Sequence, residues 1–402
     1  MPALNLYAAC LAAICAHSFY TGTRLALAVS ALRMTDAPAT VGVIMMAYAL
    51  LPALLAPRIG RAADRHGVRA LLHGCLWLLV GAGAALWWLP HGAAVLTAAA
   101  ALVGLGFNAF AVSIQKLIGG LPPTAKQIDL SAAERRKRNF GTLATASSIS
   151  SFAGPLLAGR ALDQLAAGAV FGLLAVLPML AWMLSLGWQL PPGAAPVTAP
   201  APALAAVATV AGAPVRSPLL TRPLWPLAVA TVMLTVAGDA LGFLTPIIGQ
   251  AQGFAATTVG GIVSAFAMGS FVVRLASRLF IARLREWTYL SLTLFASAAI
   301  LLLYAQVLSA PALTVLSFVL GAWLGLAQPM TQSLLHQSVP EQRVGEALGA
   351  RLALVGTAQA AGPLVFGLGA QALGTGPTLA LASLALAISG VYTVRAGKVA
   401  GR

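Results

Sequence analysis

Two short segments of the chain repeat one another: residues 154–159 read GPLLAG, and residues 362–367 read GPLVFG. An upstream glycine, Gly141 in one case and Gly349 in the other, stands 13 residues before each Gly-Pro pair. Such agreement in both residue type and spacing is difficult to obtain by chance. It predicts a fold made of two similar halves, in which these segments take corresponding places.

The composition indicates that lipid solvates most of the chain. Of the 402 residues, 59% are hydrophobic and only 8% are charged, whereas about 25% of the residues in soluble domains are charged. Backbone polar groups must be satisfied internally in a bilayer, which leaves helices and closed barrels as spanning structures. The apolar runs are continuous and about 20 residues long, as a helix needs to cross a ~30 Å hydrocarbon core. The sequence therefore predicts an all-α polytopic membrane protein.

We expect twelve transmembrane helices, arranged as two pseudo-symmetric six-helix bundles. The expected spans are residues 5–32, 41–59, 70–89, 94–118, 140–162, 169–188, 224–249, 258–280, 288–309, 312–337, 346–371 and 376–395. Residues 189–222 are rich in proline and alanine, a composition typical of a semi-extended linker. The expected organisation is thus an N-terminal bundle (1–188), a cytoplasmic linker (189–222) and a C-terminal bundle (223–402).

Two further pairs of segments match between the halves. The sequence GTRLAL, which starts at Gly22, corresponds to GDALGF, which starts at Gly238, and Thr-Val-Gly follows them at 40–42 and at 258–260. Repeated halves in a membrane protein favour a substrate site near the middle of the bilayer, between the halves. Rocking of one half against the other then exposes that site to the two sides in turn.

The distribution of positive charge predicts the orientation. With the N-terminus inside, nearly all of the 24 lysines and arginines fall on cytoplasmic segments, and only Arg24, Arg33 and Arg160 fall elsewhere. We therefore expect a multi-pass protein of a bacterial-type inner (plasma) membrane with both termini in the cytoplasm. The net charge of +15, including the basic run 135–138, is explained by contact with anionic lipid and requires no nucleic acid.

The loop between the second and third spans reads GRAADRHGVR at residues 60–69. It resembles the G-x-x-x-D-R-x-G-R-R loop of the major facilitator superfamily, with valine at position 68 in place of a basic residue. The resemblance covers the whole chain and implies a secondary transporter. Glycines permit tight turns, and an aspartate can cap the following helix and pair with arginines. The residues expected to gate conformational change here are Gly60, Asp64, Arg65, Gly67 and Arg69; a static topology loop is the alternative.

Gly154, Pro155 and Gly159 resemble the fifth-helix motif of the proton-coupled drug exporters in this superfamily, although serines between 147 and 151 stand where that motif has glycines. Small residues let helices approach closely, and proline bends a helix. We therefore expect these residues, together with Gly362 and Pro363, to take part in gating. The resemblance favours proton-coupled export of a drug-like compound or metabolite, with an importer or uniporter of an organic anion as the alternative.

Ionisable residues deep in a membrane are functional candidates by default. Asp239 lies near the middle of the seventh span, and Arg24 occupies a nearly equivalent place in the first. Because the first and seventh helices line the central cavity in this superfamily, the resemblance implies that the two residues face each other. Burial and a neighbouring arginine shift the pKa of a carboxyl group in opposite directions, so closing a cavity around such a pair can drive proton binding or release. A fixed structural pair and direct binding of an anion by Arg24 remain open.

The fourth and tenth helices also line the superfamily's cavity, and polar residues recur at helical intervals on all four of these spans. The expected cavity residues are His17, Tyr20, Thr21, Arg24, Asn108, Gln115, Thr235, Asp239, Gln328, Thr331 and Gln332. For any single glutamine or threonine, a hydrogen bond between helices is the alternative role. Arg351, near the start of the eleventh span, is expected to be a cytoplasmic anchor rather than a cavity residue.

Two other functions compete with transport: a membrane-embedded enzyme and a non-transporting sensor. The chain contains no HExxH, GxSxG or GxxxxGK[ST] motif, so its energy source must be an ion gradient or the gradient of the substrate. Its three cysteines form no CxxC pair. We expect no catalytic residue, no metal and no cofactor. The expected partners are a small-molecule substrate, protons and membrane lipids, and we expect a monomer.

Overall fold

The computed structural model describes residues 6–35, 37–65, 67–122, 127, 129, 131–188, 224–277, 285–307, 309–339 and 344–400. Within these ranges, the side chains of residues 56–57, 60–61, 63–65, 132–133, 137, 344–346 and 399–400 are not described. The expected linker, residues 189–222, lies outside the described residues.

The described residues fold into α-helices, which confirms the expected all-α class. The N-terminal helices are α1 (Leu6–Thr35), α2 (Pro38–Arg65), α3 (Val68–Trp88), α4 (Ala93–Gly119), α5 (Ala132–Gln164) and α6 (Ala167–Leu186). The C-terminal helices are α8 (Trp225–Ala251), α9 (Ala256–Ala276), α10 (Glu286–Tyr304), α11 (Ala310–Leu324), α12 (Ala327–Ser338), α13 (Val344–Leu373) and α14 (Thr375–Ala400).

Ten helical stretches in the described part are long and apolar enough to cross a membrane. Helices α11 and α12 together supply one of them, Ala310–Ser338, although the expected tenth span is broken between them. Helices α1 and α5 are not among the ten. Helix α1 carries Arg24 and Arg33, and α5 extends eight residues before the expected start, through the basic run 135–138. The protein is therefore a multi-pass membrane protein, and the exact number of twelve spans stays a prediction.

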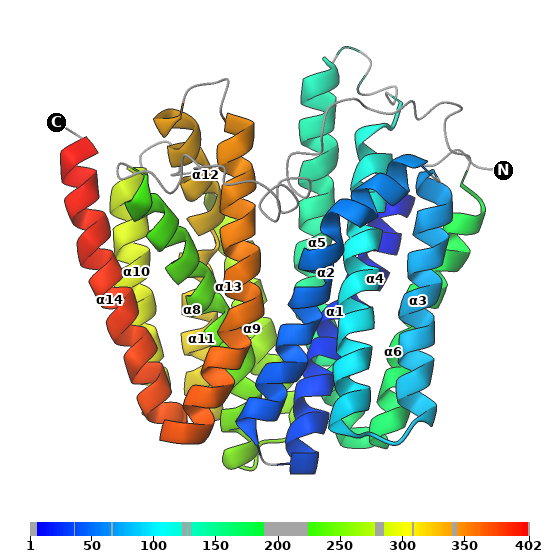
Figure 1. The fold of residues 1–402 in the computed structure, drawn as a ribbon, viewed down its shortest axis with the longest axis horizontal. Coiled ribbons are helices and arrows are strands. Elements are labelled where there is room, and N and C mark those ends of the chain that lie inside the picture. Colours follow the sequence, from blue (N-terminus) through cyan, green and yellow to red (C-terminus); the bar gives the residue numbers. More distant parts are fainter. Residues whose placement is uncertain are drawn as a thin grey trace.

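The helices form two groups, α1–α6 and α8–α14 (Figure 1). The groups meet where α5 crosses α9 and where α2 crosses α13, with a smaller contact between α1 and α8. Both crossings approach the lower end of Figure 1, where α1, α5, α8 and α13 end and α2, α6, α9 and α14 begin. We call this end the short-loop end and the opposite one the termini end.

Glycines allow the backbones of α5 and α9 to touch. A Cβ atom added at Gly159 would lie 2.5 Å from the carbonyl oxygen of Ala256. One added at Gly260 would overlap the carbonyl oxygen of Pro155. Small residues at a crossing are how helices approach closely in a membrane, where the hydrophobic effect does not drive them together.

The crossing of α2 with α13 is the counterpart of this one in the repeat. A Cβ atom at Gly42 would lie 2.7 Å from the carbonyl oxygen of Pro363, and one at Gly367 would lie 2.7 Å from the carbonyl oxygen of Pro38. Each crossing thus places the proline carbonyl and the following glycine of one repeat against the Thr-Val-Gly segment of the other half. The repeat in the sequence corresponds to a repeated contact between the halves.

Polar caps accompany both crossings at the short-loop end. The carboxylate of Asp163 accepts hydrogen bonds from the backbone N–H groups of Ala256 (2.8 Å) and Thr257 (2.7 Å) at the start of α9. The side-chain oxygen of Gln371 accepts one from the N–H of Ala39 (3.3 Å) at the start of α2. Asp163 and Gln371 both stand eight residues after the proline of their Gly-Pro pair. They satisfy N–H groups that a helix leaves free in its first turn.

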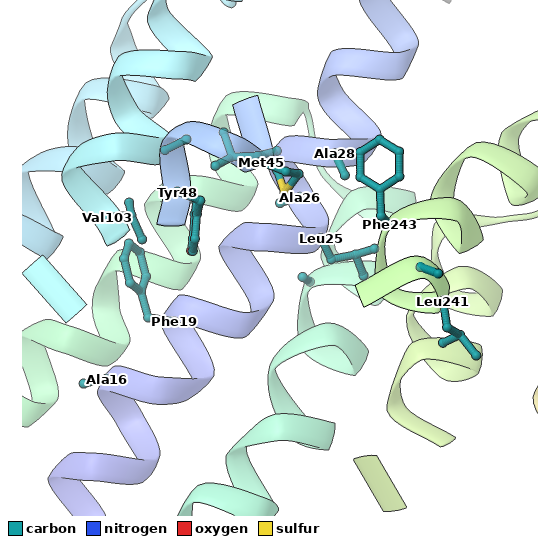
Figure 2. Close-up of a cluster of buried hydrophobic side chains, with 14 of the residues drawn as sticks. Ala16, Phe19, Leu25, Ala26, Ala28, Met45, Tyr48, Val103, Leu241 and Phe243 are labelled. Carbon is teal, nitrogen blue, oxygen red and sulfur yellow. The ribbon is translucent and has the colours of Figure 1, made fainter. Parts of the chain in front are cut away.

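Helix α1 lies at the centre of the first group, in contact with α2, α4, α5 and α6. Its apolar side chains pack into a buried core, part of which Figure 2 shows with Phe19, Leu25, Tyr48 and Phe243 labelled. Phe19 is fully buried, and Leu25, Tyr48 and Phe243 are each at most 5% exposed. Helix α1 also contacts α8, which places the first helix of one group against the first helix of the other.

We predict that Gly260→Ala destabilises the protein, because its methyl group overlaps the Pro155 carbonyl; overpacking typically costs about 1–3 kcal/mol. Gly261→Ala is a matched control, since a Cβ atom at Gly261 meets nothing within 4 Å and the gain in helix propensity is the same. The unfolding temperature in detergent can be followed with a thiol-reactive dye that reports exposure of the buried Cys10 and Cys75. Equal unfolding temperatures for the two variants would contradict the close crossing.

Asp163 predicts an acid-dependent loss of stability. Partial burial opposes the shift, but hydrogen bonds from Thr257 and Ala256 and the charge of Arg33 hold the pKa of Asp163 below its ordinary value of 3.8. A lowered pKa means that the contact is fully present above about pH 4 and is lost as the pH falls through the lowered pKa. Asp163→Asn should lower the unfolding temperature at pH 7 and flatten its decline below pH 4. A decline as steep as that of the wild type would show that another group causes it.

Candidate functional site

A cavity of about 580 Å³ lies between the two groups of helices. Helices α1, α2 and α5 form one wall, and α8, α9, α11, α12 and α13 form the other. Its described lining includes the charged residues Arg24, Asp239, Arg274 and Arg351. The cavity opens to the surface, because Arg274 and the lining residue Gln328 are exposed. It lies where the repeated halves predict a substrate site.

Arg24 and Asp239 form an ion pair across this cavity. The guanidinium Nη2 of Arg24 lies 3.5 Å from Oδ1 of Asp239, and the side chains are 36% and 10% exposed. The second carboxylate oxygen of Asp239 is buried and has no hydrogen-bond partner. The sequence placed these residues at nearly equivalent positions of the repeat, and the structure brings them together. The pair joins the two groups of helices through their first members, α1 and α8.

Aromatic residues fix α1 behind Arg24. The ring of Tyr20, which lines the cavity, stacks on Phe107 of α4 with 4.1 Å between ring centroids. The hydroxyl of Tyr48 on α2 donates a hydrogen bond to the backbone carbonyl of Tyr20 (2.6 Å). These contacts hold the turn of α1 that carries Arg24 against α2 and α4.

The face of α8 around Asp239 consists of small and hydroxyl-bearing residues. Gly238 and Gly242 line the cavity beside Asp239. Thr231 and Thr235 line it two turns and one turn earlier, and their hydroxyls donate to the carbonyls of Leu227 (2.7 Å) and Thr231 (2.9 Å), respectively, in the same helix. Because the hydroxyl protons are used within the helix, these threonines offer acceptor oxygens to the cavity.

His17 does not line the cavity. Its Nδ1 lies 2.6 Å from the hydroxyl oxygen of Ser150 on α5, and its ring stacks on Phe107 at 5.1 Å. The expected cavity role of His17 is therefore replaced by a place at the junction of α1, α4 and α5. Thr21 does line the cavity, and its hydroxyl donates to the carbonyls of His17 (3.0 Å) and Ser150 (3.2 Å).

Three further expected cavity residues also lie outside the lining. On α4, Asn108 donates to the carbonyl of Gly104 in its own helix (3.0 Å), and Gln115 is exposed elsewhere on the surface. Helix α4 packs behind α1 and α2, so these helices stand between it and the cavity. On α12, Gln328 and Thr331 line the cavity and Gln332 does not, because the helical period turns the next residue away.

The structure corrects the expectation for Arg351. Its side chain does not reach a surface; the residue is 6% exposed and lines the cavity. Its Nη2 donates a hydrogen bond to the hydroxyl of Thr331 on α12 (3.1 Å). Sequence analysis also missed Arg274 of α9 and the serines 148 and 151 of α5, which line the cavity. The serine run at 147–151 was the available signal, because serines in membrane helices gather on faces turned away from lipid, where they hydrogen-bond to neighbouring helices.

The expected gating residues are only partly described. For Gly60, Asp64 and Arg65, the structure describes only that they belong to α2. Gly67 has a φ of 78° directly before α3, a conformation that favours glycine. Arg69 donates to the carbonyl of Leu186 (3.2 Å), so in this structure it binds the end of α6 within its own half.

The second set of expected gating residues lies at helix crossings. A Cβ atom at Gly154 would lie 2.6 Å from the carbonyl oxygen of Ser18 on α1. Pro155 lines the cavity, while Gly159 and Pro363 belong to the two crossings between the halves. Gly362 is buried, but a Cβ atom there meets nothing within 4 Å, so no close approach requires glycine at this position. Among the described residues, no three histidine, cysteine, aspartate or glutamate side chains gather as metal ligands.

A cavity between two groups of membrane-crossing helices, bridged by an ion pair, defines a polytopic solute carrier. The sequence matches the Major Facilitator Superfamily over residues 9–363 and, in a second match, over residues 227–399. The chain therefore belongs to this superfamily, and it is a transporter rather than an enzyme. No curated protein matches the sequence.

Solved transporter structures share the fold. The nucleoside transporter NupG (a mutant) is 11% identical, with 98% of this chain and 100% of that chain covered and a TM-score of 0.79. A POT family transporter in complex with a thioalcohol conjugated peptide is 12% identical over 97% of this chain and 95% of that chain, with a TM-score of 0.76. The peptide transporter POT in complex with sulfate is 17% identical over 98% and 95%, with a TM-score of 0.71. At these identities the likeness shows the fold alone.

We predict that Arg24→Gln destabilises the protein more than the double variant Arg24→Gln/Asp239→Asn. The single change leaves the carboxylate of Asp239 buried without its counter-ion, which costs about 3–5 kcal/mol for a fully buried pair and less here because Arg24 is partly exposed. The double change removes both charges. Unfolding temperatures in detergent at pH 8 measure the difference, with Arg395→Gln on the surface as the control. A double variant no more stable than the single one would contradict the ion pair.

Proposed function

We propose that this protein is a proton-coupled secondary transporter that moves a small organic solute by alternating access. Two six-helix halves, residues 1–188 and 223–402 joined by the linker 189–222, rock about the central cavity. The observation that supports this proposal most is the ion pair between Arg24 and Asp239, which links the halves inside that cavity. Ion pairs within membrane helices are costly and are found where protons or substrates pass.

The pair offers a simple way to couple a proton to movement. With Asp239 ionised, its attraction to Arg24 favours a conformation in which α1 and α8 stay close. A proton on Asp239 cancels that attraction and leaves Arg24 free to turn toward solvent or solute. Because a ligand shifts an equilibrium only by its differential affinity for the two states, the proton acts on the conformational equilibrium to the extent that it breaks this pair.

We propose export in exchange for protons as the direction. The support is the resemblance of Gly154, Pro155 and Gly159 to the fifth helix of drug exporters, together with the close packing of Gly154 on α1 and of Gly159 on α9. This arrangement puts α5 between the cavity helix of one half and the crossing helix of the other. Movement of α5 therefore affects both the cavity and the contact between the halves.

The charge distribution supports the orientation. Arg69, Arg138, Arg285 and Lys398 lie at the ends of helices that point to the termini end, and basic residues are retained on the cytoplasmic side. We propose that the termini end faces the cytoplasm of a bacterial-type cell and that the short-loop end faces outward. We propose a monomer in contact with anionic lipid.

The experiment that tests this function is substrate-induced proton release in everted membrane vesicles. Wild type and Asp239→Asn are compared over a panel of organic cations, anions and neutral amphiphiles, with a pH-sensitive dye inside the vesicles. We expect a saturable response for the wild type and a loss of at least tenfold for Asp239→Asn, since the amide cannot carry the proton. Arg395→Gln, on the exposed surface of α14 and away from the cavity, is the control.

Each other outcome has a definite meaning. An unchanged response in Asp239→Asn would remove Asp239 from coupling and leave a structural pair. A response of opposite sign, with proton uptake accompanying solute entry, would establish import. Folded protein that responds to no compound would contradict proton coupling and favour a uniporter or a sensor.

A further inference from the structure

Arg351 is a buried cation whose hydrogen-bonding capacity is incompletely used. The residue is 6% exposed and lines the cavity. Its one hydrogen bond to a described residue goes from Nη2 to the hydroxyl of Thr331 (3.1 Å), and its buried Nε has no partner. A guanidinium has five N–H donors in a planar fork. Burying such a group without an anion is costly, so its position requires a compensating partner.

A second arginine of the same wall is held beside a break in a helix. Helix α11 ends at Leu324 and α12 begins at Ala327, which leaves backbone carbonyls without partners in their own helix. Nε of Arg274 donates to the carbonyl of Gly325 (2.9 Å), and the hydroxyl of Ser270 donates to that of Gly321 (2.8 Å). The hydrogen bond between Arg274 and Gly325 directs the exposed guanidinium of Arg274 to the cavity side of α12. Broken helices in transporters occur where they line a binding site.

Arg274 contacts the break before α12, and Arg351 contacts α12 itself. Gly325 stands in the break, whereas Gln328 and Thr331, three residues apart on α12, both line the cavity. Arg274 binds at the first of these positions and Arg351 at the last, and Gln328 lies between them in the cavity lining. The wall of the second half thus presents a donor-rich strip with a cation at each end.

Among the described residues, the charges that line the cavity do not balance. Its described lining contains three arginines and one aspartate, and the aspartate is paired with Arg24. Arg274 and Arg351 have no carboxylate within ion-pair distance among the described residues. The rest of the lining is largely apolar and includes Met45, Phe243 and Phe266. Pockets for drug-sized ligands measure about 300–1,000 Å³, a range that includes this cavity.

We propose that the transported solute is an organic anion, whose carboxylate or phosphate group binds Arg351 and Arg274 on the wall formed by α9, α12 and α13. Its apolar body lies against Phe243, Phe266 and Met45. This inference rests on the proposed function in one respect, that the cavity is the transport site. It assigns substrate recognition to the second half and leaves the Arg24–Asp239 pair to proton coupling.

Ligand binding to the purified protein in lipid nanodiscs tests this inference without any proton gradient. The probes form a matched series: 4-phenylbutanoate, its neutral amide 4-phenylbutanamide and its cationic counterpart 4-phenylbutylamine. Phenyl phosphate and glutarate distinguish a phosphate from a carboxylate and one acidic group from two. Binding is measured as ligand-induced stabilisation against heat. We expect the anions to stabilise the protein and the amide and the amine to have at least a tenfold weaker effect.

The variants assign this binding to the arginines. Arg351→Gln should weaken anion binding at least tenfold, and Arg351→Lys should restore part of it, because lysine keeps the charge and loses the planar fork. Arg274→Gln should weaken it less, since Arg274 is exposed. Arg395→Gln, on the exposed surface of α14, carries the same change of charge and should bind as the wild type. If Arg351→Gln fails to fold, the lysine variant and Arg274→Gln decide the question.

The inference is overturned if no anion of the series gives a stabilisation that depends on Arg351 or Arg274, or if the amide or the amine binds as well as the acid. Failure here differs from failure of the proposed function. Arginine-dependent anion binding without proton release would keep this site and reject proton coupling. Proton-coupled flux of a cation that is indifferent to Arg351→Gln would reject this site and keep the carrier.

Discussion

The ion pair between Arg24 and Asp239 is the interaction on which the proposed function depends. A charge in the bilayer must be matched by another charge, and here each half supplies one member of the pair. The two charges therefore compensate each other only while α1 and α8 keep Arg24 and Asp239 within ion-pair distance. Aromatic stacking of Tyr20 on Phe107 and the hydrogen bond from Tyr48 fix one partner, so the strength of the pair is set by how the two halves stand relative to each other.

The contacts at the short-loop end suit a movement that changes the distance between Arg24 and Asp239. The two crossings repeat each other, with Gly159 and Gly260 at one and Gly367 and Gly42 at the other. Backbones that touch through glycines can pivot without displacing large side chains. The caps provided by Asp163 and Gln371 differ, since one is a carboxylate with two hydrogen bonds and the other an amide with one. The two crossings are thus alike in their glycine contacts and different in their polar caps.

Much of this arrangement could be predicted from the sequence, because a membrane imposes few and strict rules. Continuous apolar runs specify helices, and the spacing of the Gly-Pro pairs specifies two halves. The repeat also gave Arg24 and Asp239 nearly equivalent positions, and the resemblance to the superfamily implied that they face each other. Other site residues could not be predicted, because an amphipathic pattern does not say which neighbour a polar face meets. Asn108 forms a hydrogen bond within its own helix behind α1, and His17 forms one with Ser150. The side chain of Arg351 points into the cavity, where it forms a hydrogen bond with Thr331. The break between α11 and α12 leaves no mark in hydropathy, so the position of Arg274 was also hidden.

We propose that the Arg24–Asp239 pair controls the distance between the halves. The most direct measurement is the distance distribution between spin labels at the exposed positions Ala70 and Arg395, one in each half near the termini end, in protein whose three cysteines are replaced. We predict that Asp239→Asn, which imitates the protonated acid, shifts the populations of this distribution relative to the wild type at pH 8. Lowering the pH should move the wild type toward the variant and leave the variant unchanged. Identical distributions for the two proteins at every pH would contradict this proposal.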